Sequence, residues 1–405
     1  MTTAPAALDD FPAALPFPRR LAILGSTGSI GASTLRVVDS LPERFEVVAL
    51  AAGGNLDKLE AQARRYRPRL LSVRAPEDAR ELARRLAGLE PRPEILHGPA
   101  GLCAAAASSG ARMVVAAVVG IAALQAAYDA LRAGCWLALA NKEILVAGGE
   151  LVMAAAQRSG APVLPVDSEH SALHQCLRGG RRGELRRLIL TASGGPFRQL
   201  PLEHFDRLTP EQALRHPTWT MGERVTLDSA TLMNKGFEIL EACHLFGVSE
   251  RQVDVLIHPQ SLVHSLVEFR DGSLLAQLGC ADMALPVQYA LTWPERLEVG
   301  RELRLQEWSR LDFHSPDPRR FPCLELARAA GRAGGAAGAA LNAADEVALA
   351  AFRRGALPFP AIARVIEAVL GRFHAPTPRS IGDILEIDSQ VRRLAEDRVA
   401  AEIKA

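Results

Sequence analysis

The stretch Leu21–Leu35 reads LAILGSTGSIGASTL, in which an apolar run is followed by Gly25, Gly28 and Gly31. An apolar strand that ends in glycines and leads into a helix is typical of the first βα unit of a dinucleotide-binding fold. Glycine permits a tight turn and lets the backbone approach a pyrophosphate at the helix N-terminus, and the hydroxyl side chains of the turn can add hydrogen bonds. The spacing is GxxGxxG rather than GxGxxG, so a purely structural strand-to-helix turn remains an alternative.

Short apolar runs alternate with amphipathic segments through roughly the first 165 residues. One such segment, Ile121–Arg132, has helical spacing and is followed by Gly134, a residue suited to end a helix. This alternation predicts a parallel sheet with helices on both faces. The predicted strands are Leu21–Leu24, Glu46–Leu50, Leu70–Val73, Met113–Val118, Trp136–Ala140 and Val163–Val166.

The pattern changes after Asp167. Further strands are predicted at Leu188–Thr191 and Val253–His258, and then a hairpin in which Asp271-Gly272 joins His264–Phe269 to Ser273–Leu278. Residues 310–322 are polar and proline-rich, and the chain beyond them is alanine-rich with helical periodicity. We therefore expect an α/β protein with a flexible extension (1–19), a Rossmann-like doubly wound parallel sheet (20–167), an α+β domain (168–309), a linker (310–322) and a helical domain (323–405).

Composition limits the function classes. The 405 residues are 48% hydrophobic with a net charge of +1, so the chain can bury large cores and has little long-range attraction for nucleic acid or an anionic membrane. We find no apolar run of the roughly 18 residues that span a bilayer, and no signal-peptide core at the N-terminus. The 6 cysteines form no CxxC pair. We expect a cytoplasmic protein with reduced thiols that binds neither nucleic acid nor membrane.

The residues after the second predicted strand decide between NAD and NADP. An NAD site usually places a carboxylate there for the ribose 2′-hydroxyl, but Val47–Leu50 runs into Ala51-Ala-Gly-Gly-Asn55. This small, neutral turn favours NADP, although it also lacks the expected arginine. Lys58 and Arg64 are the nearest candidates for the compensating charge, and they fit ordinary surface cations of a helix equally well.

Carboxylates follow the sixth predicted strand, in the sequence Asp167-Ser168-Glu169-His170. Ligands of open α/β sheets gather at the carboxyl ends of the strands, and two carboxylates this close repel each other unless a cation lies near them. Asp167 and Glu169 are therefore candidate ligands of a hard metal ion. The alternative is that Ser168 and Glu169 simply start a helix.

A second polar cluster lies in Leu227–Leu240, LDSATLMNKGFEIL. We expect Asp228 or Ser229 to cap a helix on which Asn234, Lys235 and Glu238 share one face. These groups suit a phosphorylated, metal-bound substrate. Taken alone, the Lys235–Glu238 spacing is equally that of a surface ion pair worth about 0.3–0.5 kcal/mol.

Histidines offer a rival kind of metal site. His170 and His174 are four residues apart, but their order with the preceding glutamate does not match the HExxH motif of zinc peptidases. An all-oxygen site of Asp167, Glu169 and Glu238 would instead suit Mg²⁺ or Mn²⁺. We expect His174 to be a packing residue.

Taken together, these motifs closely resemble the 1-deoxy-D-xylulose 5-phosphate reductoisomerase family, in order and over about residues 20 to 400. The motifs are GSTGSIG, LANKE (Leu139–Glu143), PVDSEH (Pro165–His170), TASGGPF (Thr191–Phe197), HPTWTMG (His216–Gly222), DSATLMNKGFE (Asp228–Glu238), LIHPQS (Leu256–Ser261) and LNAADE (Leu341–Glu346). The resemblance implies an NADPH-dependent, Mg²⁺- or Mn²⁺-dependent oxidoreductase that converts 1-deoxy-D-xylulose 5-phosphate to 2-C-methyl-D-erythritol 4-phosphate in the non-mevalonate isoprenoid pathway. It also implies a homodimer and a rearrangement through retro-aldol and aldol steps before the hydride transfer.

The resemblance assigns roles to individual residues, and it implies Asp167, Glu169 and Glu238 as the metal ligands. The family often has a basic residue where this chain has Gly54. The implied cofactor contacts are Thr27, Gly28, Ser29, Ile30, Gly53, Gly54, Asn55, Asn141, Glu143 and Gly222. The implied substrate contacts are Lys142, Ser168, Glu169, His216, Trp219 and Glu238, with Ser193, Ser229, Asn234 and Lys235 around the phosphate; Lys142 and the three metal ligands are the implied catalytic residues.

The segment His216–Gly222 is a candidate lid over the substrate. Trp219 can cover the ligand, and Pro217 and Gly222 are expected hinges; a surface loop whose tryptophan packs on its own domain is the alternative. Two rival functions are a semialdehyde-type dehydrogenase, which needs an activated cysteine in a matching motif, and a non-catalytic NADP-binding regulator, which would tolerate loss of the carboxylates and Lys235.

Overall fold

The computed structural model describes residues 14–217, 219, 221–298 and 300–404. The chain folds into two compact units. Unit 1 is formed by the described residues of Met1–Ile144, Glu150–His174 and Asp282–Glu302, and unit 2 by those of Leu145–Gly149, Gln175–Ala281 and Leu303–Ala405.

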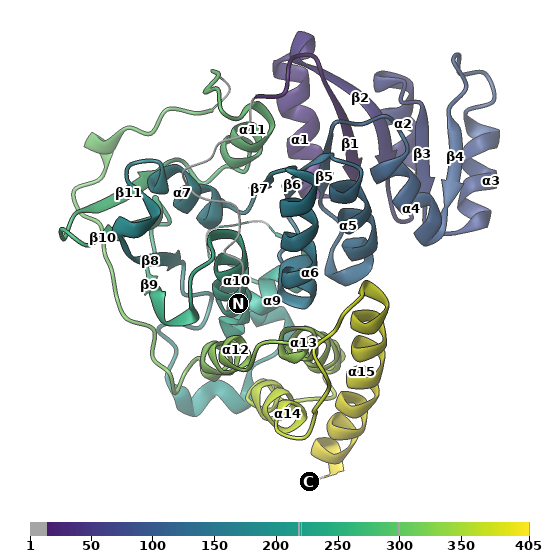
Figure 1. Ribbon diagram of the computed structural model, residues 1–405. Helices are drawn as coiled ribbons and strands as arrows, with labels where there is room; N and C mark the ends of the chain where they lie inside the picture. The colour runs from purple at the N-terminus through teal and green to yellow at the C-terminus, as the bar shows by residue number, and fades with distance from the viewer. Residues whose placement is uncertain (1–13, 218, 220, 299, 405) are drawn as a thin grey trace. The chain divides into compact units, whose positions relative to one another are not determined.

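Unit 1 is built on a 7-stranded sheet of order β4-β3-β2-β1-β5-β6-β7, in which every pair of neighbours is parallel (Figure 1). Its strands are β1 (Arg19–Leu24), β2 (Phe45–Ala51), β3 (Leu70–Val73), β4 (Glu94–His97), β5 (Met113–Ala116), β6 (Trp136–Leu139) and β7 (Val163–Pro165). Nearly all residues of β1, β3, β5 and β6 are buried, as expected of a parallel sheet that is covered on both faces. The predicted Rossmann-like sheet is confirmed.

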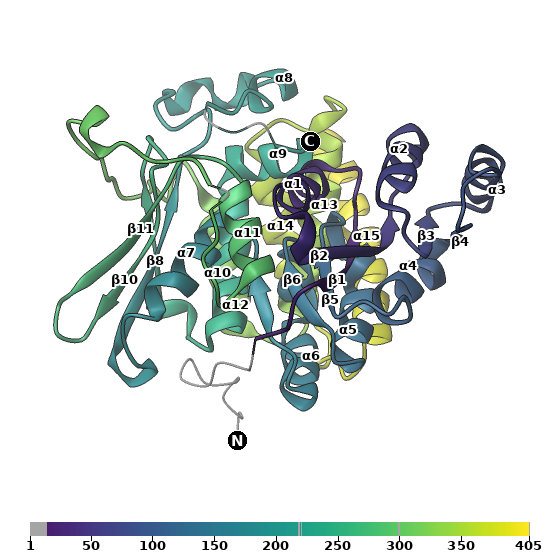
Figure 2. The same cartoon turned by 90° about the horizontal axis from the view of Figure 1, so that it is seen from above.

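Helices cover both faces of this sheet, with α1 and α2 on one side and α4 and α5 on the other (Figure 2). The helices in this part of the chain are α1 (Ser29–Ser40), α2 (Leu56–Tyr66), α3 (Pro76–Arg85), α4 (Gly98–Ala107), α5 (Leu124–Arg132), α6 (Glu143–Ser159), α7 (Ser168–Leu177) and α11 (Ala284–Thr292). The predicted helix over 121–132 is present as α5 preceded by one 3₁₀ turn, and Gly134 follows it with φ of 78°.

Two features of unit 1 differ from the sequence-based expectations. The edge strand β4 was not predicted, because its sequence Glu-Ile-Leu-His is short and none of its side chains is fully buried. The extension expected over residues 1–19 is not loose at its end. Leu15 is buried, and the buried Arg19 in β1 donates hydrogen bonds to the carbonyls of Leu291 (2.5 Å) and Trp293 (3.0 Å). Residues 1–13 lie outside the described residues.

Unit 2 contains a 4-stranded sheet of order β11-β10-β8-β9. Its strands are β8 (Leu185–Ala192), β9 (Val253–Ile257), β10 (Val263–Phe269) and β11 (Leu274–Leu278). The strands β8 and β9 are parallel, and the other pairs are antiparallel. The predicted hairpin turn is confirmed, because Gly272 has φ of 88° and its N–H donates to the carbonyl of Phe269 at 3.0 Å.

The rest of unit 2 is mainly helical, as predicted for the end of the chain. The helices are α8 (Pro210–Ala213), α9 (Glu223–Thr231), α10 (Met233–Phe246), α12 (Pro322–Ala333), α13 (Ala337–Arg353), α14 (Ala361–Leu370) and α15 (Ile381–Lys404). Across both units, short 3₁₀ segments lie at Pro42–Arg44, Gly120–Ala123, Arg182–Glu184, Leu202–Arg207, Glu250–Gln252 and Leu305–Glu307. None of the described helices is both long and apolar enough to cross a membrane.

The helix expected over 227–240 is two helices. Leu232 adopts a left-handed conformation (φ 62°) that ends α9, and α10 begins at Met233. Asp228 and Ser229 therefore lie inside α9 rather than capping the helix that carries Glu238. The hydroxyl of Thr231 accepts the Met233 N–H at 3.2 Å and satisfies one of the first donors of α10.

The units also divide the chain differently from the expected sequential domains. The segment Asp282–Glu302, placed in the α+β domain by sequence, belongs to unit 1, where Arg19 binds two carbonyls at the C-terminal end of α11. The 4-stranded sheet and the C-terminal helices belong to one unit. Within the expected linker, His314 forms an isolated antiparallel β-bridge with Ile257, the last residue of β9.

Candidate active site

The turns that follow the parallel strands of unit 1 carry most of the predicted site residues. Because neighbouring strands run in the same direction, their carboxyl ends share one edge of the sheet. The turn after β1 carries Thr27–Ile30, that after β2 carries Gly53–Asn55, that after β6 carries Asn141–Glu143, and that after β7 carries Asp167–Glu169. This edge is therefore the candidate nucleotide and metal site of unit 1.

The glycine turn after β1 leaves no room for side chains at two positions. A Cβ at Gly31 would lie 2.4 Å from the carbonyl oxygens of Gly25 and Ser26. A Cβ at Gly25, which has φ of 87°, would lie 2.4 Å from the carbonyl oxygen of Ala117 after β5. Gly25 and Gly31 thus allow the backbone of the turn to pack directly against neighbouring carbonyl groups. Gly28 is exposed and serves as the N-cap of α1.

The start of α1 presents groups suited to an anion. Among the described side chains none caps this helix, and its first turn contains no acidic residue, so its N–H groups and helix dipole favour a phosphate. Thr27 and Ile30 are partly exposed, and Ser29 is exposed. The hydroxyl of Ser26, in contrast, is fully buried and donates to the Gln62 side chain at 2.8 Å. The expectation that every hydroxyl of the turn can bind a ligand is therefore wrong for Ser26.

The turn after β2 is open. Gly53, Gly54 and Asn55 are exposed, and the Asn55 side chain caps α2 by accepting the Lys58 N–H at 3.1 Å. Arg64, expected as a source of compensating charge, is instead bound to Glu60 at 2.8 Å and to the carbonyl of residue 85 at 2.7 Å.

The turn after β6 is buried and ordered by an asparagine. The side chain of Asn141 donates to the carbonyl of Gly120 at 2.7 Å and accepts the Ile144 N–H at 3.2 Å. This holds the residues between them, Lys142 and Glu143, at the start of α6. Both side chains are mostly buried.

Asp167 forms an ion pair with Lys142, and the two side chains are 12% and 11% exposed. Burial raises the pKa of the Asp167 carboxyl, but the nearby charges of Lys142 and His170 outweigh this effect, so the pKa lies below its usual range. Asp167 is therefore an ionised carboxylate in a region of low exposure, which suits a group that binds a cation.

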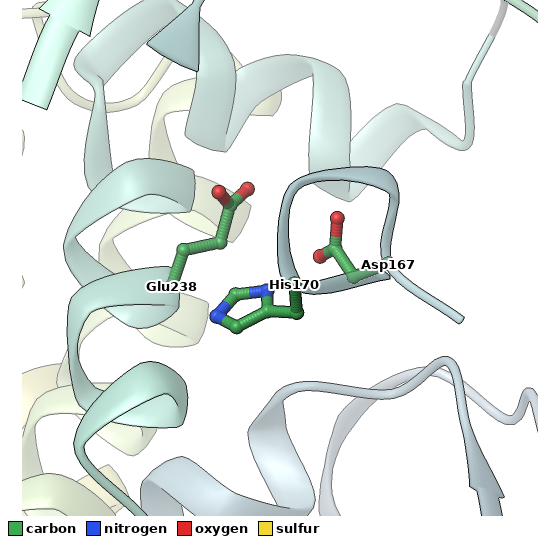
Figure 3. A group of neighbouring side chains, drawn as sticks. All are labelled: Asp167, His170 and Glu238. Atoms are coloured by element: carbon green, nitrogen blue, oxygen red, sulfur yellow. The ribbon is translucent and has the colours of Figure 1, made fainter. Parts of the chain in front are cut away.

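Further polar residues follow on α7. Figure 3 shows Asp167 just before the helix and the His170 ring one turn later. A carboxylate oxygen of Asp167 and a ring nitrogen of His170 lie within 4.8 Å of one another, close enough to share a metal ion. The Glu169 side chain accepts a hydrogen bond from the Ser168 hydroxyl at 2.5 Å. His174 bonds Tyr289 at 2.7 Å and packs against Trp293, as a packing residue.

In unit 2, the predicted polar face of α10 is present and buried. Glu238, drawn in Figure 3, is 1% exposed and accepts a hydrogen bond from the Asn234 amide at 2.6 Å. Its other oxygen forms an ion pair with Lys235, which is also buried. A buried pair needs further hydrogen bonds to offset its desolvation. Because both side chains are buried, Lys235 and Glu238 do not form the exposed surface pair that their spacing also allowed.

Ser193 and His216 form a second cluster in unit 2. The His216 Nδ1 accepts the backbone N–H of Trp219 at 2.9 Å, so its Nε2, 2.9 Å from the Ser193 oxygen, carries the donated proton. Burial lowers the pKa of His216 and favours this neutral form. The Ser193 oxygen also accepts the Gly195 N–H at 3.2 Å, so its own proton is directed elsewhere.

The loop after β8 brings this cluster to Ser229 on α9. Gly195 has φ of 66°, and a Cβ on it would lie 2.6 Å from the Ser229 carbonyl oxygen. The sequence indicated the Gly194-Gly195 pair within TASGGPF but gave it no role. In the candidate lid, Trp219 is half-buried and its ring faces His264 at 6.5 Å, and the exposed Gly222 is the N-cap of α9. Thr218 and Thr220 lie outside the described residues.

The fold and these turns define a Rossmann-type enzyme class in which a nucleotide-binding sheet is joined to a second, α+β unit. Family models named 1-deoxy-D-xylulose 5-phosphate reductoisomerase, its C-terminal domain, and DXP reductoisomerase C-terminal domain match residues 21–149, 163–246 and 278–394. The chain belongs to the 1-deoxy-D-xylulose 5-phosphate reductoisomerase family.

Full-length relatives of that name are similar to the chain. The protein from Moorella thermoacetica is 53% identical over 379 residues, which cover 93% of this chain and 97% of the relative. The protein from Synechococcus sp. is 49% identical over 374 residues, with coverage of 92% and 95%. The solved structure of the reductoisomerase from Zymomonas mobilis in complex with NADPH is 41% identical, with a TM-score of 0.89 and coverage of 94% and 99%.

A further solved reductoisomerase, in complex with NADPH, fosmidomycin and magnesium, is 39% identical, with a TM-score of 0.89 and coverage of 94% and 98%. These similarities extend over both units. The rival interpretation as a semialdehyde-type dehydrogenase is therefore wrong.

Proposed function

We propose that this chain catalyses the reaction that names its family, the NADPH-dependent conversion of 1-deoxy-D-xylulose 5-phosphate to 2-C-methyl-D-erythritol 4-phosphate. The observation that carries the proposal is the pairing of each central carboxylate with a lysine: Asp167 with Lys142 in unit 1, and Glu238 with Lys235 in unit 2. Such groups suit a substrate with neighbouring oxygens at one end and a phosphate at the other.

We assign the divalent cation, Mg²⁺ or Mn²⁺, to Asp167, Glu169 and Glu238. The donor set fits a hard cation, because it consists of carboxylate oxygens, and Asp167 is already ionised in a mostly buried position. When bound, the cation would stabilise the negative charge that develops on the substrate oxygens as a carbon–carbon bond breaks. His170 offers a nitrogen next to Asp167, and we regard it as an orienting neighbour rather than a ligand.

The two lysines are well placed to bind and orient the substrate. Lys142 and Ser168 follow neighbouring parallel strands, β6 and β7, and we assign them to the carbonyl and hydroxyl end. Lys235 and Asn234 begin α10, and we assign them, with Ser193 and Ser229, to the phosphate. The neutral His216 donates to Ser193, so the free proton of the Ser193 hydroxyl can point to a phosphate oxygen.

NADPH fits the turns of unit 1. The cramped glycine turn and the start of α1 suit the pyrophosphate, and the turn Ala51–Asn55 contains no carboxylate that would repel a 2′-phosphate. We assign Thr27–Ile30, Gly53–Asn55, Asn141, Glu143 and Gly222 to the cofactor. A solved relative binds NADPH, which supports this assignment.

The reaction can be followed directly by the fall in NADPH absorbance when 1-deoxy-D-xylulose 5-phosphate is added. We expect oxidation of NADPH that stops with a metal chelator and returns when Mn²⁺ or Mg²⁺ is restored. NADPH binding without turnover under all these conditions would contradict the proposed reaction and favour a non-catalytic NADP-binding regulator.

We further propose that the chain forms a homodimer through strand β11. This strand ends the 4-stranded sheet, and its Leu274 and Leu275 are 54% and 38% exposed. An exposed apolar edge strand favours pairing with a second copy. Leu274→Lys should lower the mass measured by light scattering to that of a monomer, whereas Leu305→Lys, which changes another exposed leucine, should not. A dimeric Leu274→Lys protein would contradict this interface.

We also infer that the protein acts in the cytoplasm. The six cysteines are thiols rather than disulfides: Cys103, Cys135, Cys176, Cys243, Cys280 and Cys323. Free thiols persist in reducing compartments. Fractionation of the producing cells, followed by detection of the protein, would test this location, and recovery outside the cytoplasmic fraction would contradict it.

A further inference from the structure

A guanidinium lies beside the open turn after β2. Arg74 directly follows β3, which pairs in parallel with β2 through Ala51 and Ser72. The Arg74 N–H donates to the Gly53 carbonyl at 3.3 Å, which ties the two turns together. A Cβ built on Gly54 would lie 3.5 Å from Nη2 of Arg74. The guanidinium of Arg74 thus lies next to the space that a side chain at position 54 would enter.

The charge of Arg74 is available to a ligand. The side chain is exposed, and within the described part of the chain no carboxylate lies within ion-pair distance of it. The acidic residue in the first turn of α2, Asp57, is already paired with Arg85. An anion at this turn would therefore meet the positive charge of Arg74 together with the N-terminus of α2.

We infer that Arg74 binds the 2′-phosphate of NADPH and determines the preference of this enzyme for NADPH over NADH. The inference rests on the proposed function, since it concerns the cofactor of that reaction. A planar guanidinium can donate two parallel hydrogen bonds to a phosphate. The adenosine ribose would lie over the turn Gly53–Asn55, with its 2′ oxygen toward Arg74.

The position of Arg74 also accounts for the glycine at position 54. A basic side chain at that position would place a second cation close to the Arg74 guanidinium, and two like charges at that separation repel each other. With glycine at position 54, the cation comes from the neighbouring strand. The turn after β2 can therefore lack an arginine and still recognise NADPH.

Binding measurements on the protein without substrate test this inference. We would titrate wild type and Arg74→Ala with NADPH, NADH and 2′,5′-ADP by calorimetry. Loss of a charge-assisted hydrogen bond predicts roughly 10- to 100-fold weaker binding of NADPH and 2′,5′-ADP, with NADH unchanged. Arg92→Ala is the control. It removes an equal charge from an exposed residue that precedes β4. Arg92 therefore lies at the amino ends of the parallel strands, whereas Arg74 lies at their carboxyl ends, and the loss of Arg92 should leave all three affinities unchanged.

A second variant guards against a structural effect. In Arg74→Ala/Gly54→Arg the cation returns from the turn itself, and NADPH binding should recover by at least about half of the lost factor. The inference would be overturned if Arg74→Ala bound NADPH as tightly as wild type, or if its affinity for NADH fell by the same factor as its affinity for NADPH. It would also be overturned if Lys58→Ala weakened NADPH binding and Arg74→Ala did not. Wild-type protein that binds neither dinucleotide would overturn the proposed function as well.

Discussion

The carboxyl groups of Asp345 on α13 and Asp228 on α9 lie close enough inside unit 2 for the charge of one to act on the other. Asp345 is fully buried and Asp228 is 3% exposed. Burial and the charge of Asp228 raise the pKa of Asp345 well above its usual value, although Arg224 opposes this. Asp345 therefore keeps its proton to a higher pH than an ordinary carboxyl group does. Because Ser229 follows Asp228, this proximity connects α13 of the C-terminal helices to α9, the helix whose Ser229 we assign to the substrate phosphate.

The first prediction concerns stability and pH. A carboxyl whose pKa is raised by folding stabilises the protein below its unfolded pKa, and this contribution is lost as the pH rises toward the folded pKa. We expect the free energy of unfolding of wild type to fall between pH 4 and neutrality by up to about 1.4 kcal/mol per pH unit from this group. Asp345→Asn, which mimics the protonated acid, should flatten this fall in urea unfolding curves.

Asp388→Asn provides the contrast for that experiment. The carboxylate of Asp388 is held by Arg392 at 2.6 Å, so its loss should lower stability without flattening the pH dependence. An Asp345→Asn protein whose stability falls with pH as steeply as that of wild type would show that Asp345 does not keep its proton to a higher pH.

The second prediction concerns Glu238. Glu238→Gln removes the charge that compensates Lys235 and that we assign to the metal. We expect kcat to fall by at least about 100-fold because stabilisation of negative charge in the transition state is lost. A matched Glu325→Gln change, at an exposed residue of α12, should leave kcat unchanged. Activity within a few-fold of wild type would remove Glu238 from the metal site.

The third prediction tests the lid. The backbone N–H of Trp219, not its ring, binds His216, so Trp219→Ala keeps that hydrogen bond. We expect kcat/KM to fall by at least about 10-fold, or about 1.4 kcal/mol, while the free energy of unfolding changes by less than about 1 kcal/mol. Unchanged kinetics would instead favour a surface loop packed on its own unit.

The fourth prediction concerns the protonation of His216. Burial lowers its pKa, so the folded protein binds fewer protons than the unfolded chain near pH 6.5, and this contribution to stability rises with pH. We expect nitrogen NMR shifts of a neutral ring protonated on Nε2 throughout pH 6.5–8. A ring that gains a proton near pH 7 would refute this tautomer.

The fifth prediction concerns the glycine turn. A methyl group at Gly31 must displace backbone oxygens 2.4 Å away, so Gly31→Ala should cost about 1–3 kcal/mol of stability and weaken NADPH binding. At Gly88 a Cβ meets none of the described atoms within 4 Å, so Gly88→Ala should be tolerated. Equal melting temperatures for the two variants would argue against the close approach.

Sequence patterns predicted the parts of the fold that depend on neighbouring residues. Apolar runs located the strands of the parallel sheet except β4, whose short, partly exposed sequence carries no strong pattern. The Asp271-Gly272 turn predicted the hairpin correctly. The break between α9 and α10 could not be predicted, because Leu232 adopts a left-handed conformation that leucine rarely takes.

Contacts between distant parts of the chain could not be read from sequence. The spacing of Asn234, Lys235 and Glu238 predicted their common face but not their burial, which depends on the packing around α10. The bond between Ser26 and Gln62 joins residues 36 positions apart. Similarly, Arg74 follows a different strand from Gly54, and nothing in the local sequence connects them.

The contact between Gly54 and Arg74 has a consequence for how the family varies. Since one cation suffices and two would repel, substitutions at the two positions are coupled. Members with lysine or arginine at the position of Gly54 should carry a neutral or acidic residue at that of Arg74, and the reverse exchange should accompany glycine. A comparison of many sequences should then show a basic residue at one or the other of these two positions but not at both, because the contact to the phosphate can come from either strand end.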